Sequence, residues 1–218
     1  MGIGRVCASR GIHGFIGVDF VAYQHPEGLR LLAVDLNLRY TDTLAAFHMF
    51  DFLMGGRYDS ASTGRYFVDK RPGVVLGPLT AAQVASPQQH GLATRHYVVS
   101  QYVRHPNLSS IQYSNFFNLC RMKGISFDLQ EKKGTAFNLV DSFATGVLGV
   151  MGVGSSLLDC FSTVERGLLF IQKQVGVHKE PVAGSLEEDE DANFKEILAA
   201  VKFVVQILST AAAKAQKK

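Results

Sequence analysis

The sequence predicts an α+β fold, with a mostly antiparallel sheet flanked by helices and a C-terminal amphipathic helix. Two observations predict it. Runs rich in β-branched and aromatic residues stand in pairs around turn residues, which is typical of antiparallel hairpins. The helical periodicities are isolated between these pairs and do not alternate regularly with strands, as they would in a fold built on a parallel sheet.

Composition restricts the class of protein. With 218 residues, 47% hydrophobic and 19% charged, the chain can form one globular domain, alone or with an appendage. A net charge of +3 without a basic stripe gives no indication of nucleic-acid binding. Cys7, Cys120 and Cys160 include no C-x-x-C pair, which favours a reducing compartment. No run has the length of a signal peptide or membrane span, so we expect a cytoplasmic protein without a membrane segment.

The first half of the chain is expected to hold one hairpin between two helices. The expected elements are a helix over 3–10, strands over 15–23 and 29–40, a turn over 24–28 and a helix over 42–54. Thr41 or Asp42 can cap the second helix, and Gly55-Gly56 can end it. Residues 57–93 are less regular; RYFVD (65–69) and GVVLG (73–77) are short strand candidates, and 78–91 is expected to form a loop or short helix.

The second half is expected to add four strands and three helices. The strands are predicted at 95–103, 125–130, 134–141 and 147–154, and the helices at 108–122, 157–174 and 193–216. Residues 131–134 are expected to form a hairpin turn. IQYSNFFNLCR (111–121) resembles a calmodulin-binding IQ pattern, but Phe116-Phe117 replace its central residues, which favours a buried aromatic face. The glycines at 146–154 favour tight packing on a sheet over a phosphate-binding loop.

Composition changes near the C-terminus. Residues 179–192 include five consecutive acidic residues and read as an exposed linker after a lobe over 1–178. Residues 193–218 contain a strongly amphipathic helix whose apolar face must be covered. Two alternatives remain open: the helix docks on its own domain, or it binds a protein partner in a groove.

The candidate site lies on the hairpin. Side chains alternate along a strand, so Asp35, Asn37 and Arg39 are expected on one face and Leu36 and Leu38 on the opposite, apolar one. Asp19 on the first strand can lie beside them. Carboxylate and amide oxygens suit Mg²⁺, and a guanidinium suits phosphate oxygens. The following helix start would favour an anionic substrate group there. The alternative is a solvated sheet face.

These residues resemble the metal-binding end of the ATP-grasp family of carboxylate–amine ligases. The pattern G-x-D-F, a hairpin and acidic-x-Asn-x-Arg carries the resemblance, with Asp35 where most members have Glu. The resemblance implies that Asp19, Asp35 and Asn37 bind Mg²⁺ and that Arg39 contacts the transferred phosphate of ATP. It also implies that the turn with Thr41, Asp42 and Thr43 faces the second substrate.

Within that family, GFIGVDFV, AVDLNLRYTDTLA and GTAFNLVDSF are similar to the ATP-grasp-like C-terminal region of the IQ motif-containing protein H family, over residues 5–178. The family's nucleotide-binding lobe precedes this region, so we expect residues 1–178 to form an incomplete lobe that lacks its nucleotide pocket unless another chain supplies it. Two functions follow as expectations: an Mg-ATP-dependent ligase module acting through an acyl phosphate, or a non-catalytic interaction domain of a cilium- or flagellum-associated protein. Partners are expected at the C-terminal helix or the missing lobe.

Overall fold

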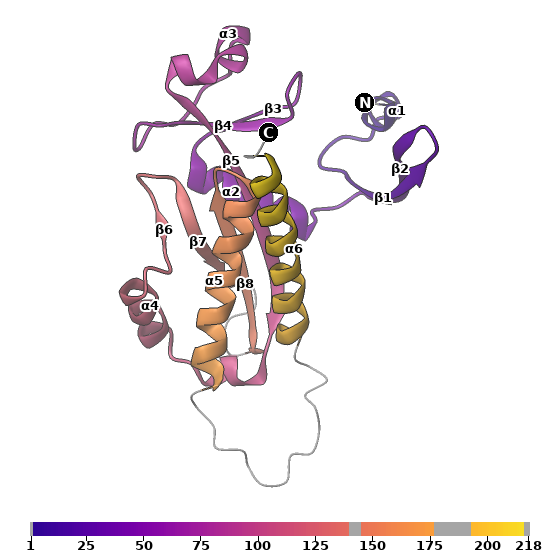
Figure 1. Ribbon diagram of the computed structural model, residues 1–218. Helices are drawn as coiled ribbons and strands as arrows, with labels where there is room; N and C mark the ends of the chain where they lie inside the picture. Colours follow the sequence, from indigo (N-terminus) through magenta and orange to yellow (C-terminus); the bar gives the residue numbers. More distant parts are fainter. Residues whose placement is uncertain (1, 140–144, 177–192, 216–218) are drawn as a thin grey trace. The chain divides into compact units, whose positions relative to one another are not determined.

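A computed structural model of the chain describes residues 2–139, 145–176 and 193–215. It confirms the α+β class: every strand pair in these ranges is antiparallel, and helices flank the larger sheet (Figure 1). The chain divides into an N-terminal unit, Met1–Phe50, and a C-terminal unit, Asp51–Lys218, with the boundary inside helix α2 (Asp42–Met54). The predicted linker over 179–192 lies outside the described residues.

The N-terminal unit is built on the predicted hairpin. Helix α1 (Gly2–Ser9) precedes strands β1 (Gly17–His25) and β2 (Gly28–Asn37), which pair over their whole length. Gly28 follows the two-residue turn, and its φ of +119° is a value that residues with a side chain adopt only with strain. Strand β2 ends at Asn37, earlier than predicted, because Thr41 already begins the cap of α2.

The apolar side expected for this hairpin is not covered. Leu36 and Leu38 are 43% and 56% exposed, and the large apolar side chains of both strands are similarly open. Among the described residues, the apolar face that was predicted for this strand is therefore exposed. Alternation placed the side chains on two faces, but a two-stranded ribbon has no second layer of its own to cover either.

The C-terminal unit contains one six-stranded sheet in the order β3-β4-β5-β8-β7-β6. Its strands are β3 (Arg57–Asp59), β4 (Arg65–Asp69), β5 (Leu92–Arg104), β6 (Phe127–Asp128), β7 (Lys133–Asn138) and β8 (Val147–Gly154). Strand β8 lies between β5 and β7, and each of its residues is buried. The centre of the sheet is thus formed by the glycine-rich segment.

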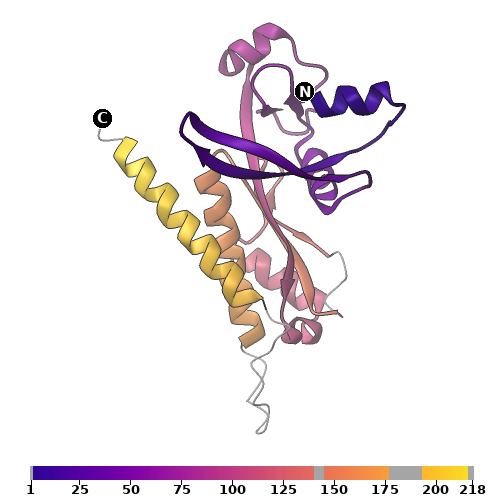
Figure 2. The ribbon, with the colours of Figure 1, turned by 90° about the vertical axis from the view of Figure 1, so that its right-hand side faces the viewer.

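Helices cover this sheet. They are α3 (Ala81–Ala85), the 3₁₀ turns η1 (Pro87–His90) and η2 (Pro106–Ser110), α4 (Tyr113–Met122), α5 (Leu157–Gly176) and α6 (Phe194–Ala215). Helix α5 packs on β8, and α6 lies along α5, as Figures 1 and 2 show. A Cβ on Gly152 would lie 2.4 Å from the carbonyl oxygen of Cys160, which confirms that the glycines permit close packing.

Helix α6 docks on its own unit, as one of the two alternatives predicted. Phe194, Leu198 and Val201 are buried, whereas Phe203 and Ile207 are exposed. By length and composition α6 could also cross a membrane, with a mean hydropathy of 1.6 over its most apolar window. One such helix is weak evidence for a membrane span, because core helices of soluble proteins have the same length and hydropathy. The aromatic-face prediction for α4 is confirmed for Phe116, whose ring is buried, whereas Phe117 is 37% exposed.

Three local predictions were wrong. Residues 73–77 form no strand, because side chains and not a neighbouring strand bind their carbonyl groups. Lys132 Nζ donates to the carbonyl of Val74, and Arg57 Nε donates to the carbonyl of Leu76. Helix α4 starts at Tyr113 because Pro106 opens a separate 3₁₀ turn. The β6–β7 turn lies two residues earlier than predicted, at 129–132, because Asp128 accepts the N–H groups of Gln130 and Glu131.

Candidate functional site

The structure brings three of the predicted residues together at one end of the hairpin. Asp19 and Asp35 are direct partners across β1 and β2. The side-chain nitrogen of Asn37 donates to Asp35 Oδ2 at 3.0 Å and to Asp19 Oδ2 at 3.3 Å. One polar group therefore lies within hydrogen-bond distance of both carboxylates.

Strand geometry explains this convergence. Asp35 and Asn37 are two residues apart on β2 and share a face, and Asp19 lies opposite on β1. The register changes directly after Asp19, because Phe20 pairs with Ala33 and leaves Val34 as an extra residue on β2. Such bulges redirect side chains and are frequent beside functional sites.

The two carboxylates have no cationic partner in the part of the chain that the structure describes. Like charges placed directly opposite on paired strands repel each other. Among the described residues, the pair accepts hydrogen bonds from Asn37 and from the backbone N–H of Leu36, which donates to Asp35 Oδ1 at 2.8 Å. The arrangement is therefore one that a divalent cation would stabilise.

The donor set fits Mg²⁺. Mg²⁺ prefers oxygen ligands at about 2.0–2.1 Å, usually from one or two carboxylates with water and substrate phosphates completing the shell. Rotating the Asn37 amide would turn its oxygen toward the carboxylates, since oxygen and nitrogen exchange places at little cost in shape. No group of three or more His, Cys, Asp or Glu side chains occurs among the described residues, so a metal here would depend on the amide.

Arg39 lies outside this group. It follows the end of β2 by two residues, and its side chain makes no hydrogen bond or ion pair with any residue that the structure describes. Thr41 accepts the N–H of Leu44 at 3.3 Å and caps α2, as predicted. A Cβ on Gly17 would lie 3.2 Å from the Thr41 methyl and 3.4 Å from Asn37 Cβ, so the cap is close to the carboxylate group.

Asp42 and Thr43 are exposed in the first turn of α2. Their predicted contact with a second substrate stays a prediction. The start of this helix nevertheless lies beside the site, because its cap residue Thr41 does.

Sequence reasoning missed an aromatic cluster next to this site. The rings of Tyr40 and His48 stack with 5.8 Å between centroids, and Phe15 packs edge-on against them at 6.0 and 5.4 Å. Phe15 precedes β1 and Tyr40 follows β2, so antiparallel pairing brings both to the same end of the ribbon. That pairing was the signal that could have revealed the cluster.

Comparison with known proteins agrees with the hairpin motif. Residues 1–61 match the family model described as IQCH-like, ATP-grasp, and this range contains the whole carboxylate group. Over 205 residues the chain is 26% identical to IQ motif-containing protein H from Danio rerio, covering 93% of this chain and 17% of the relative. The chain therefore spans a small part of the curated relative's length. No solved structure matches the chain.

These matches confirm the predicted resemblance. An ATP-grasp-like domain of the kind found in IQ motif-containing protein H is indicated, and the matched range contains helix α1 and both strands of the hairpin.

Proposed function

We propose that the N-terminal unit is the metal-binding part of an Mg-ATP-dependent carboxylate–amine ligase module that acts through an acyl phosphate. The observation that supports it most directly is the convergence of Asp19, Asp35 and Asn37 on one end of the hairpin. The family match over the same residues supports it independently.

Each residue has a part in this proposal. Asp19, Asp35 and the amide oxygen of Asn37 would hold Mg²⁺, which when bound neutralises charge on the terminal phosphates of ATP. A substrate carboxylate attacks the terminal phosphorus, and the bond to ADP breaks as the acyl phosphate forms. Arg39 would stabilise the negative charge on the transferred group. Its freedom from other partners among the described residues leaves it able to turn toward a phosphate.

The second half of the reaction would use the start of α2. An amine attacks the acyl carbon, loses a proton and expels phosphate, which leaves with the bonding electron pair. Thr41, Asp42 and Thr43 would position this second substrate. The N–H groups at the start of α2 favour negative charge, which suits the departing phosphate.

Metal binding can be measured apart from turnover. Mn²⁺ can replace Mg²⁺ at oxygen sites and is visible by electron paramagnetic resonance. We expect the 218-residue chain to bind Mn²⁺ and the Asp35→Ala, Asn37→Ala double variant to lose this binding. Asp35→Asn, which removes charge and keeps shape, should weaken Mn²⁺ binding about tenfold or more.

A matched control is Glu196→Gln, which removes one negative charge from an exposed position on α6 and should leave Mn²⁺ binding unchanged. Absence of Mn²⁺ binding, or equal binding by Asp35→Asn, would overturn the metal site. ATP turnover that persists after Asp35→Ala would overturn the ligase proposal.

A second function is favoured by one observation. The hairpin exposes apolar side chains of both strands, including Phe20, Leu31 and Val34, and exposed apolar patches often mark protein interfaces. The chain could then serve as a non-catalytic ATP-grasp-derived interaction domain of a cytoplasmic, cilium- or flagellum-associated protein. Binding of a protein partner that survives Asp35→Ala and is lost on Leu31→Asp would favour this function over the ligase.

A further inference from the structure

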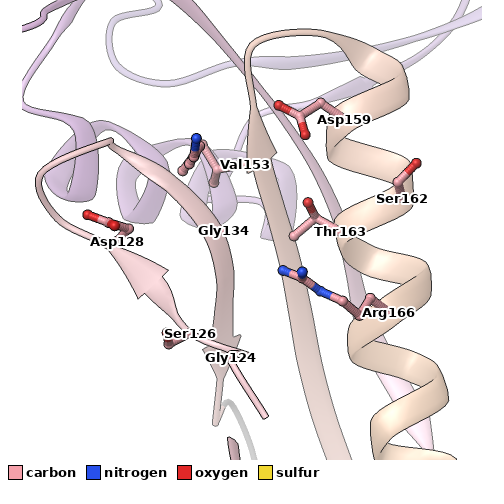
Figure 3. Close-up of a pocket in the computed structure, with 10 residues that line it drawn as sticks. Gly124, Ser126, Asp128, Gly134, Val153, Asp159, Ser162, Thr163 and Arg166 are labelled. Atoms are coloured by element: carbon pink, nitrogen blue, oxygen red, sulfur yellow. The ribbon is translucent and has the colours of Figure 1, made fainter. Parts of the chain in front are cut away.

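A hollow of about 490 Å³ lies in the C-terminal unit between α5 and the β6–β7 hairpin, as Figure 3 shows. Its volume is within the range of small-molecule sites, about 300–1,000 Å³. Asp159, Thr163 and Arg166 extend from α5 toward it, because residues at i, i+4 and i+7 share one face of a helix. The hairpin supplies the facing wall with Asp128 and Lys133.

A second hollow of about 500 Å³ shares Ser162 and Arg166 with the first. It is lined by the apolar side chains of Ile125 and Leu169, by the cationic side chains of Lys123 and Lys173, and by the acidic side chain of Glu165. Arg166 therefore stands where a polar hollow meets a more apolar one. A ligand with a charged group and an apolar part would span the two.

The acidic residues of the first hollow are already engaged. Asp128 accepts the backbone N–H groups of Gln130 and Glu131 at 2.8 and 2.9 Å, which lowers its pKa. Asp159 accepts the N–H and hydroxyl of Ser155 at 2.9 and 3.2 Å. One oxygen of each carboxylate, Asp128 Oδ1 and Asp159 Oδ2, thus accepts hydrogen bonds that hold the turn and the start of α5.

The cationic side is different. Arg166 is exposed, and its guanidinium makes no hydrogen bond or ion pair with any residue in 2–139, 145–176 or 193–215. Lys133 pairs with Glu131 at 3.6 Å, but both side chains are more than half exposed, so this pair is weak. Among the charged side chains that line the first hollow, the Arg166 guanidinium is therefore the one without a hydrogen bond or ion pair to a described residue.

Hydroxyl side chains line the same hollow as Arg166. Thr163 precedes Arg166 by less than one helical turn and is largely buried, and Ser126, which precedes β6, lines the same hollow. A guanidinium with nearby hydroxyls recognises the oxygens of phosphate or carboxylate groups by charge-assisted hydrogen bonds.

We propose that Arg166 anchors the phosphate or carboxylate group of a small molecule whose apolar part lies against Ile125 and Leu169. This site lies in the C-terminal unit and does not depend on the metal site of the hairpin. Neither the family match nor the relative's name assigns it.

The test uses amide NMR titrations of the 218-residue chain with inorganic phosphate, phenyl phosphate and benzoate at constant ionic strength. Saturable shifts are expected at Gly124, Gly134 and Thr163. Phenyl phosphate should bind more tightly than inorganic phosphate, because its ring adds apolar contact. Comparison of the affinities of phenyl phosphate and benzoate shows whether the site prefers a phosphate or a carboxylate group.

Arg166→Gln should weaken binding about tenfold, because it removes hydrogen bonds from a charged donor. Arg166→Lys keeps the charge, loses the two-pronged geometry and should give intermediate affinity. Lys202→Gln, on the exposed side of α6, removes the same charge outside both hollows and should leave affinity within about twofold.

Linear, non-saturating shifts with all three probes would overturn the proposal, as would equal affinity of Arg166→Gln and the unchanged chain. Equal affinity for phenyl phosphate and inorganic phosphate would overturn the proposed contact of the ligand's apolar part with Ile125 and Leu169. Thermal unfolding of each variant verifies that it is folded.

Discussion

The β1–β2 hairpin and strand β8 are both rich in apolar residues, and their surroundings differ completely. Every residue of β8 is buried between β5 and β7 and beneath α5. In the hairpin, Leu29, Leu31, Leu32 and Val34 are all more than half exposed. Apolar strand sequence alone therefore does not determine burial; the presence of neighbouring strands and a covering helix does.

This difference separates two kinds of site. An isolated two-stranded ribbon is marginally stable in water, so the carboxylate group of the hairpin rests on a scaffold that gains most from a partner surface. The hollow around Arg166 is built on the sheet and helix that hold the main core. Mutations should consequently have large effects on stability in the C-terminal unit and small ones in the hairpin.

The largest effect is expected from a matched pair of leucine truncations. Leu168 on α5 is 0% exposed, and Leu31 on β2 is 65% exposed. Leu168→Ala should lower the free energy of unfolding by about 2–5 kcal/mol, because it removes buried surface and leaves a cavity. Leu31→Ala should change it by less than about 0.5 kcal/mol. Urea unfolding followed by circular dichroism measures both, and similar losses would contradict the contrast.

The close contact between α5 and β8 gives the next largest effect. A Cβ on Gly152 would lie 2.4 Å from Cys160 O and 2.7 Å from Val164 Cγ2. Gly152→Ala should therefore destabilise the protein by about 1–3 kcal/mol through overpacking. Gly77→Ala is the control, because nothing lies within 4 Å of its Cβ position and its φ is not positive. Tolerance of alanine at Gly152 would show that α5 can move away from the sheet.

Acid should act on the C-terminal unit through Asp69. Hydrogen bonds from Arg71 lower the pKa of this buried carboxyl to about 2, below its unfolded value of about 3.9. Its stabilising contribution is complete above the unfolded value and is lost as pH falls through about 2. Asp69→Asn should reduce stability near neutral pH and flatten the decline between about pH 4 and 2.

Urea midpoints measured across that pH range test this prediction. Glu196→Gln, at an exposed position of α6, should retain the slope of the unchanged protein. Parallel curves for Asp69→Asn and the unchanged protein would place the acid-sensitive group elsewhere.

Local sequence signals predicted much of this fold. The Pro–Gly turn predicted the hairpin, and the strict alternation of Asp35 and Asn37 predicted their shared face. The glycines of β8 predicted close packing against α5. These features depend on residues close together in the sequence, so local rules suffice.

Features set by distant contacts could not be predicted in this way. Lys132 satisfies a carbonyl 58 residues away, at Val74, and this bond replaces a strand that the apolar run 73–77 would otherwise favour. The exposure of Leu36 and Leu38 depends on the absence of a covering layer among the described residues, which their own sequence does not encode. The Arg166 hollow likewise arises where α5 meets β6 and β7. Alternation also extended the predicted second strand to Tyr40, whereas the cap at Thr41 ends it sooner, at Asn37.

The smallest expected effect concerns a buried hydroxyl without a hydrogen-bond partner in the six-stranded sheet. Thr135 on β7 is 2% exposed, and its hydroxyl has no hydrogen-bond partner among the described residues. Thr135→Val has the same shape and removes the unpaired hydroxyl, so it should raise the free energy of unfolding by about 1 kcal/mol. Thr80→Val makes the same chemical change where the hydroxyl accepts the N–H of Gln83 and caps α3. Loss of this cap should lower the free energy of unfolding by about 0.5–2 kcal/mol. The loss is smaller if α3 unfolds by itself at a lower cost. Urea unfolding measures the change in the free energy of unfolding for each variant. Changes of opposite sign would establish that the effect of removing the hydroxyl depends on whether it has a hydrogen-bond partner. A loss of stability at both positions would contradict this.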